Sequence, residues 1–249
     1  MAFTRSIISR KFQWEALSDF AESGLRRGAP ILPFTGGMAS TSGMSIAPSF
    51  SFAGDQGGGA LGAIGSHLFD YVVWLFAPVA RLCGQLSTTI ATRPDPLTGE
   101  AKPVDADDTC TLMLELTDGT PCQACLSAVT YQGRGHWVEV YGDRGTLVLG
   151  SDNQSDYVHG FKLWGSQAGQ PLTELEIPAR LAFPATYPDG RLAPFIRVVD
   201  QWVQGIEQGR PLAPSLQEGV YSQLLMDLTH QSHQTGTWVE VPPLNSILP

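Results

Sequence analysis

The hydrophobic and polar positions follow clear periods from about residue 54 onward, and these periods predict most of the secondary structure. Ser66–Phe76 is an apolar segment that follows a glycine-rich loop and precedes Pro78, which predicts a helix. Alternating apolar positions predict strands at 81–92, 109–116, 120–131, 136–141, 146–149, 158–164, 172–177 and 238–241. The turns at Thr117–Gly119 and Gly142–Gly145 predict two hairpins within this series.

Two more helices are expected near the end of the chain. Apolar residues recur at helical spacing between Leu192 and Ile206. A second helix begins at the capping box Ser215-x-x-Glu218 and runs to about Gln234, where Gly236 ends it. The simplest interpretation of both apolar helix faces is that they pack in the core.

The order of these elements predicts an α+β fold for residues 54–249. Strands that cluster without alternating helices form a large, mainly antiparallel open sheet with the helices on one face. Residues 1–53 are different, because a weak helical pattern at Trp14–Leu25 is followed by Gly, Pro, Ser and Met without periodicity. We expect an irregular, poorly ordered or peripheral N-terminal segment there.

Composition and charge narrow the function classes. Hydrophobic residues make up 43% of the 249 residues, enough for a folded core. The net charge of −9 argues against a nucleic-acid partner. No apolar run reaches the length of about 18 residues that a membrane span needs, and the first residues lack the apolar centre of a secretory signal. We therefore expect a cytoplasmic protein, and we interpret its four cysteines (Cys83, Cys110, Cys122 and Cys125) as reduced, buried thiols.

The glycine-rich loop is the first candidate for chemistry. Gly57–Gly62 matches the dinucleotide pattern G-x-G-x-x-G, and a helix follows it. That fingerprint also requires a buried strand before it and an acidic residue about 20 positions later, and both are missing. No such motif occurs further upstream, so we expect no complete Rossmann domain in this chain.

The helix after the loop brings four functional side chains to one face. His67, Asp70, Tyr71 and Trp74 are spaced i, i+3, i+4 and i+7. The positive end of the helix dipole disfavours a charged imidazole in the first turn, and a neutral His67 suits hydrogen bonding to a substrate hydroxyl or proton transfer. The alternative is a capping histidine and a solvated aspartate on a helix that buries Trp74.

Two further groups are weaker candidates for metal sites. His230 and His233 lie three residues apart on a helix, but no other ligand pattern completes a site. Asp105, Asp107 and Asp108 are numerous enough to bind a cation, but they lack the spacing of a calcium loop. We interpret these aspartates as part of a solvated surface loop, and we predict no metal site.

Several motifs together resemble the Gfo/Idh/MocA oxidoreductase family. They are Gly57–Leu61 running into Gly65-Ser66-His67-x-x-Asp70, then Val104–Thr109, then Tyr141–Leu147. The resemblance covers about residues 54–242 and corresponds to the C-terminal half of the family. It implies oxidation or reduction of a sugar or cyclitol carbon with NAD or NADP, and it implies that the open sheet face packs against a second subunit in a homo-oligomer.

The resemblance also assigns residues. It implies that His67 is the catalytic histidine and that Asp70 faces the substrate, together with Gly58, Gly59 and Ser66. The family usually carries an Asp four residues before its histidine, but Ala63 stands at this position.

The cofactor-binding half of the family has no counterpart in residues 1–53. Three hypotheses follow. The chain is the substrate-binding half of an oxidoreductase and inactive alone, a non-catalytic binding or assembly module, or a truncated or frame-shifted fragment.

Overall fold

The computed structural model describes residues 32–37, 58–95, 97–130, 135–151, 161–167, 169–176, 183–243 and 246. The helical elements are the π-helical turn η2 (Leu61–Gly65), α3 (Ser66–Leu75), α5 (Leu192–Glu207) and α6 (Leu216–Thr235). The strands are β1 (Leu32–Gly37), β2 (Val79–Ser87), β3 (Thr92–Pro94), β4 (Ala101–Pro103), β5 (Thr109–Leu116), β6 (Pro121–Ser127), β7 (His136–Tyr141), β8 (Gly145–Ser151), β9 (Lys162–Gln167), β10 (Thr173–Glu174) and β11 (Val239–Glu240).

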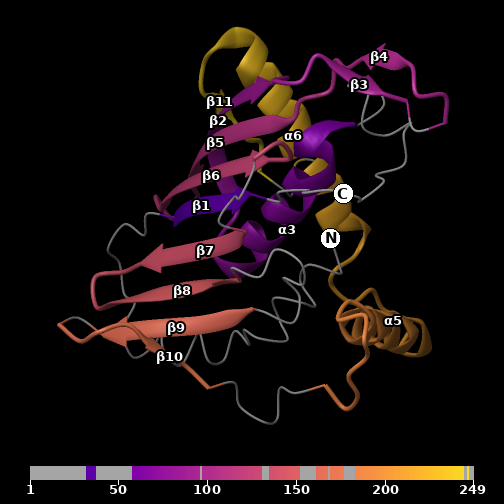
Figure 1. The fold of residues 1–249 in the computed structure, drawn as a ribbon. Helices are drawn as coiled ribbons and strands as arrows, with labels where there is room; N and C mark the ends of the chain where they lie inside the picture. The colour runs from indigo at the N-terminus through magenta and orange to yellow at the C-terminus, as the bar shows by residue number, and fades with distance from the viewer. Residues whose placement is uncertain are drawn as a thin grey trace.

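The strands form a broad layer with helices on one side (Figure 1). One sheet has the order β1-β6-β5-β2-β11, and a second has the order β10-β9-β8-β7. Figure 1 shows β1 beside β7, so the second sheet continues the first. Every pair of neighbouring strands is antiparallel except β1 and β6, which are parallel. The predicted α+β fold with a mainly antiparallel sheet is confirmed.

The position of β1 differs from the expectation for the N-terminal segment. Leu32–Gly37 forms a strand that pairs with Cys122–Ser127 of β6. The sequence PFTGG offers no alternation, so the strand follows from its neighbour's free edge rather than from its own pattern. The helix predicted at Trp14–Leu25 lies outside the described residues, as do parts of the strands predicted at 158–164 and 172–177.

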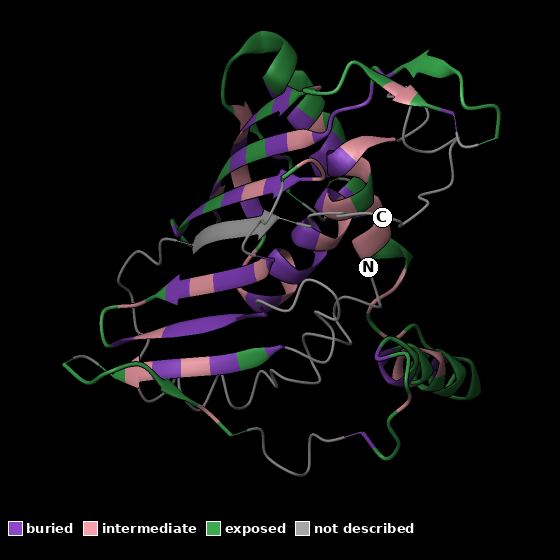
Figure 2. Ribbon diagram, in the orientation of Figure 1, coloured by how far each residue is buried: buried purple, intermediate pink, exposed green. Residues whose placement is uncertain are grey.

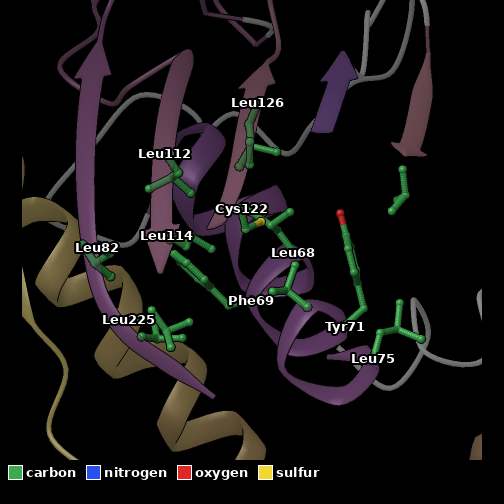
Figure 3. Close-up of a cluster of buried hydrophobic side chains, with 14 of the residues drawn as sticks. Leu68, Phe69, Tyr71, Leu75, Leu82, Leu112, Leu114, Cys122, Leu126 and Leu225 are labelled. Atoms are coloured by element: carbon green, nitrogen blue, oxygen red, sulfur yellow. The ribbon is translucent and has the colours of Figure 1, made fainter. Parts of the chain in front are cut away.

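The core lies between the sheet and helices α3 and α6 (Figure 3). Leu68 and Phe69 of α3 and Leu225 of α6 are fully buried against the sheet. α6 approaches β2 closely at Gly84, because a Cβ atom there would come within 2.6 Å of the Thr229 side chain. A glycine at this point therefore lets helix and strand pack closely.

Both ends of α6 follow the prediction. The Ser215 side chain accepts a hydrogen bond from the backbone N–H of Gln217 at 3.2 Å. The Glu218 carboxylate accepts one from the backbone N–H of Ser215 at 2.6 Å, which completes the capping box. At the other end Gly236 has a φ of 67°, the left-handed conformation that commonly ends a helix.

The prediction that α5 packs its apolar face in the core is wrong. Phe195, Trp202 and Ile206 are 55%, 68% and 64% exposed. Figure 2 shows α5 largely in the colour of exposed residues, at a distance from the sheet. The apolar period does predict a helix at these residues, but it does not say what covers the face.

The cysteines, the segment between β2 and β5 and the lengths of the helices complete the description. Cys110 and Cys122 are buried, whereas Cys83 and Cys125 are half-buried, and all four are free thiols. The segment between β2 and β5, which the sequence indicated to be a surface loop, contains the short hairpin β3–β4. No helix among the described residues has the length and apolar character needed to cross a bilayer.

Candidate functional site

The start of the helix that carries His67 is fixed by Asp107, which lies before β5. The Asp107 carboxyl accepts a hydrogen bond from the backbone N–H of Leu61 at 2.9 Å, and its backbone oxygen accepts one from Ala60 at 2.8 Å. Gly59 has a φ of 95°, and a side chain there would overlap the Asp107 carboxyl. The glycine therefore allows the close approach that this cap requires.

This cap decides whether the glycine-rich loop fits a dinucleotide. In a Rossmann domain the pyrophosphate occupies the free N–H groups at the start of the helix. Here an acidic side chain of the protein already takes the N–H of Leu61. Burial raises the pKa of Asp107, although its hydrogen bonds oppose the rise. The loop therefore does not fit a pyrophosphate.

The prediction that the three aspartates belong to a solvated loop is wrong for two of them. Asp107 and Asp108 are 8% and 2% exposed. The Asp108 carboxylate accepts hydrogen bonds from the backbone N–H groups of Thr89 and Ile90, both at 2.9 Å. Burial acts to raise the pKa of Asp108, but these bonds outweigh it and lower the pKa. Asp105 is exposed, as predicted.

His67 stands half-buried in the first turn of α3. Its Nδ1 atom is buried and has no hydrogen-bond partner among the described residues. Its Nε2 atom is not among such buried atoms and accepts no bond from the described residues, so Nε2 is the ring atom that contacts solvent. Burial lowers the pKa of His67 from 6.5 to about 4. The imidazole is therefore neutral at pH 7, as predicted.

The residues that share a face with His67 turn inward. Asp70 and Tyr71 are 2% and 1% exposed, and Trp74 is half-buried. Figure 3 shows Tyr71 extending from α3 toward the sheet. The alternative of a solvated Asp70 is therefore wrong, and the assignment of Asp70 to substrate binding stays a prediction.

His136 on β7 is a neighbour of this face that the sequence analysis missed. Its ring centroid lies 6.1 Å from that of Tyr71 and 5.3 Å from that of Phe161. Burial first, and then the imidazole of His67, lower the pKa of His136 to about 4. A signal was present, because His136 alternates with Val138 and Val140, which belong to the core.

The other predicted site residues lie around the start of the helix. The Ser66 hydroxyl donates a hydrogen bond to the backbone oxygen of Gly62 at 3.1 Å. Gly58 and Gly59 are half-buried, and Ala63 is exposed. Substrate binding by Gly58, Gly59 and Ser66 stays a prediction.

Of the two histidines on α6, His233 has a structural contact. His230 and His233 are both exposed, and His233 Nδ1 accepts a hydrogen bond from the backbone N–H of Leu86 at 3.3 Å. Within the part of the chain that the structure describes, no three His, Cys, Asp or Glu residues are grouped to hold a metal ion.

Comparisons with known sequences place these residues in a wider group. A family model described as the C-terminal alpha/beta domain of an oxidoreductase family, Gfo/Idh/MocA, matches residues 52–241. An uncharacterized oxidoreductase of Synechocystis is 56% identical over 195 residues, which are 78% of this chain and 53% of that protein. The levoglucosan dehydrogenase of Pseudarthrobacter phenanthrenivorans is 25% identical over 211 residues, 76% of this chain and 53% of the relative. The chain thus spans about half the length of these relatives.

Solved structures share the fold. A levoglucosan dehydrogenase in complex with NADH and L-sorbose superimposes with a TM-score of 0.77 at 20% identity, over 98% of this chain and 66% of that one. An NAD binding oxidoreductase from Klebsiella pneumoniae superimposes with a TM-score of 0.73 at 20% identity, over 97% of this chain and 66% of its own. At this identity the likeness concerns the fold alone.

Proposed function

The chain belongs to the Gfo/Idh/MocA oxidoreductase family, and from this membership we propose that it is the substrate-binding half of an NAD(P)-dependent oxidoreductase. Its substrate class is a sugar or cyclitol with a reacting hydroxyl or carbonyl group. The observation that carries the proposal is His67, a neutral imidazole with Nε2 open to solvent at the start of α3. A relative that is named for its action on levoglucosan, an anhydrosugar, supports the substrate class.

The role of His67 follows from its protonation state. A neutral imidazole accepts a hydrogen bond from a substrate hydroxyl at Nε2 and holds that hydroxyl in place. With a pKa of about 4, His67 is a weak base in the free protein, so binding and orientation come first and proton transfer depends on the bound substrate.

The cofactor belongs outside the glycine-rich loop. Since Asp107 caps the helix start, this loop does not offer the free N–H groups that the pyrophosphate of a dinucleotide needs. The NADH complexes among the structural neighbours support NAD or NADP, and we propose that this cofactor binds outside the described residues of the chain. We propose that the chain alone does not turn over.

The test measures binding and turnover separately. Titration of the chain with polyols and cyclic sugars, followed by calorimetry, is expected to give binding that His67→Gln weakens at least about tenfold. His230→Gln, on the exposed side of α6, is the matched control. A set of sugars that all fail to bind overturns the proposed function, and steady reduction of NAD or NADP by the chain alone overturns its inactivity.

A second candidate is a non-catalytic binding or assembly module. The observation that favours it is Ala63, exposed four residues before His67, where a carboxylate would orient the imidazole and stabilise its charged form. The experiment restores the carboxylate with Ala63→Asp and supplies in trans the part of the Synechocystis relative that this chain does not match. Turnover that requires both Ala63→Asp and the added part of the relative supports an oxidoreductase site. Sugar binding without any turnover supports the non-catalytic module.

We also propose a homo-oligomer, with a second copy on the face of the sheet opposite α3 and α6. Met113 lies on this face and is 47% exposed, with Cys83 and Gln123 beside it in register. Exposed apolar surface of this kind favours association. Sedimentation is expected to show a dimer that Met113→Lys weakens, and a monomer at all concentrations rejects the proposal.

A further inference from the structure

A second histidine is packed beside the helix that carries His67. The rings of His136 and Phe161 meet edge to face, with centroids 5.3 Å apart and an interplanar angle of 76°. The ring of Tyr71 lies on another side, at a centroid distance of 6.1 Å. Both distances are in the range of stabilising aromatic pairs. β7 therefore places the His136 ring beside the Tyr71 side chain of α3.

The contact between His136 and Tyr71 bears on His67 because Tyr71 and His67 belong to the same helix, α3. His67 and Tyr71 are four residues apart, so they lie on the same face of α3. Tyr71 is only 1% exposed, which leaves its ring little room to move. The imidazole of His67 also lowers the pKa of His136, after burial, as expected for two rings on this side of α3. Three rings from α3 and β7 thus form one group although about 70 residues separate them in sequence.

We propose that His136 is a positioning residue for His67, holding the His67 face of α3 in place through its contacts with Tyr71 and Phe161. The proposal assigns to β7 a part in the site that the motif on α3 does not include. It rests on the proposed role of His67, but its test requires neither substrate nor cofactor.

The protonation of the pair supplies the readout. Among the described residues, the other titratable side chains near the pair are Asp70 and Tyr71 on α3 and Cys122 on β6, and the positive charge of the chain's N-terminus, after burial, also lowers the pKa of His67. Burial raises the pKa of Tyr71 above its usual value and that of Cys122 to about 12, so both stay protonated over the range in which imidazoles titrate. Asp70→Asn serves as the control for the remaining carboxyl group.

The experiment follows the histidine ring protons by nuclear magnetic resonance between pH 3 and pH 8. The chain has five histidines, so single His→Gln variants assign each signal. In His136→Ala the lost ring admits water beside His67, and the pKa of His67 is expected to rise by at least about 1 unit toward 6.5. His136→Phe keeps a ring in contact with Tyr71 and Phe161, and it is expected to restore the chemical shift of His67. His230→Ala is the matched control and leaves His67 unchanged.

The reciprocal variant protects the test against a failure of His136→Ala to fold. Because His67 is half-buried, His67→Gln is expected to fold and to raise the pKa of His136. An unchanged His136 titration in His67→Gln, or an unchanged His67 signal in folded His136→Ala, overturns the proposal. If the unmodified chain binds no sugar while the coupling between the two histidines is intact, the result counts against the proposed function alone.

Discussion

The two helices near the end of the chain, α5 and α6, differ in how far their apolar side chains are buried. α6 buries Tyr221 and Leu225 against the sheet, with 3% and 0% of their surfaces exposed. α5 leaves Phe195, Trp202 and Ile206 more than half exposed. Both helices carry apolar residues at helical spacing, yet only α6 packs its apolar face against the sheet.

The two helices differ in whether their small and polar residues fit a neighbouring strand. On α6, Ser232 accepts a hydrogen bond from the backbone N–H of Gly84 at 3.0 Å, and Thr229 packs on the same glycine. These contacts require a strand with a glycine at one position, and β2 supplies it. Within the described part of the chain, no strand meets α5 in this way, and the buried residues of α5 are Ala193, Pro194 and Gly205. An apolar face predicts a helix, whereas complementary small residues decide where it packs.

The sharpest test of the comparison is a pair of truncations. Leu225→Ala on α6 leaves a cavity in the core and is expected to lower the free energy of unfolding by about 2–5 kcal/mol. Ile206→Ala on α5 is the matched control, with an expected change within about 0.5 kcal/mol, because Ile206 is 64% exposed. Urea unfolding measures both, and equal losses would show that α5 is covered in solution.

The cap at the start of the His67 helix is expected to have the next largest effect. Asp107→Ala removes the acceptor for the Leu61 N–H in a buried setting and should cost about 1–3 kcal/mol. Asp105→Ala, two residues earlier in the chain and exposed, is the matched control. The same urea titration measures both. A loss no greater than that of the control would mean that water replaces the carboxyl at no cost.

The N-terminal caps of the two closing helices give a smaller contrast. Ser215→Ala breaks the capping box of α6 and is expected to cost about 1 kcal/mol. Arg191 at the start of α5 makes no side-chain cap, so Arg191→Ala should leave stability unchanged within about 0.5 kcal/mol. Thermal unfolding followed by circular dichroism compares the two, and equal shifts in Tm would contradict the expected difference.

The smallest expected change in stability comes from making α5 polar. Trp202→Gln with Ile206→Gln should alter the free energy of unfolding by less than about 0.5 kcal/mol while reducing self-association, because exposed apolar patches drive contact between molecules. Light scattering over a range of protein concentrations measures the association. If scattering does not fall in the double variant, the exposed apolar face of α5 does not drive self-association.

The sequence predicted the elements with strong local signals. β5 (Thr109–Leu116) and β7 (His136–Tyr141) have the predicted bounds, and α6 begins and ends at its predicted caps. β1 could not be predicted, because its pairing with β6 depends on an edge formed 85 residues or more along the chain. Periodicity carries no information on such distant partners.

The candidate site was predictable only in part. The neutral state of His67 was expected from a place in the first turn of a helix, whereas the helical turns already begin at Leu61 and burial is the largest cause of its low pKa. The burial of Asp107 and Asp108 was missed, because a run of aspartates in a Pro-rich segment has the composition of a surface loop. The carboxyl oxygens of Asp107 and Asp108 accept hydrogen bonds from backbone N–H groups, and the sequence pattern does not show which N–H groups these are. His136 was missed because only the contact with Tyr71 makes it part of the site.

The bond between Leu61 and Asp107 joins residues 46 positions apart. The helix that carries His67 can therefore form its first turn with a satisfied N–H only after the chain around β5 has arrived. Loop closure of this length is slow compared with the growth of a helix. We expect the start of this helix at Leu61 to become ordered after the middle of α6, whose N–H groups bond within the helix, so hydrogen exchange during refolding should protect Leu225 on α6 before Leu61.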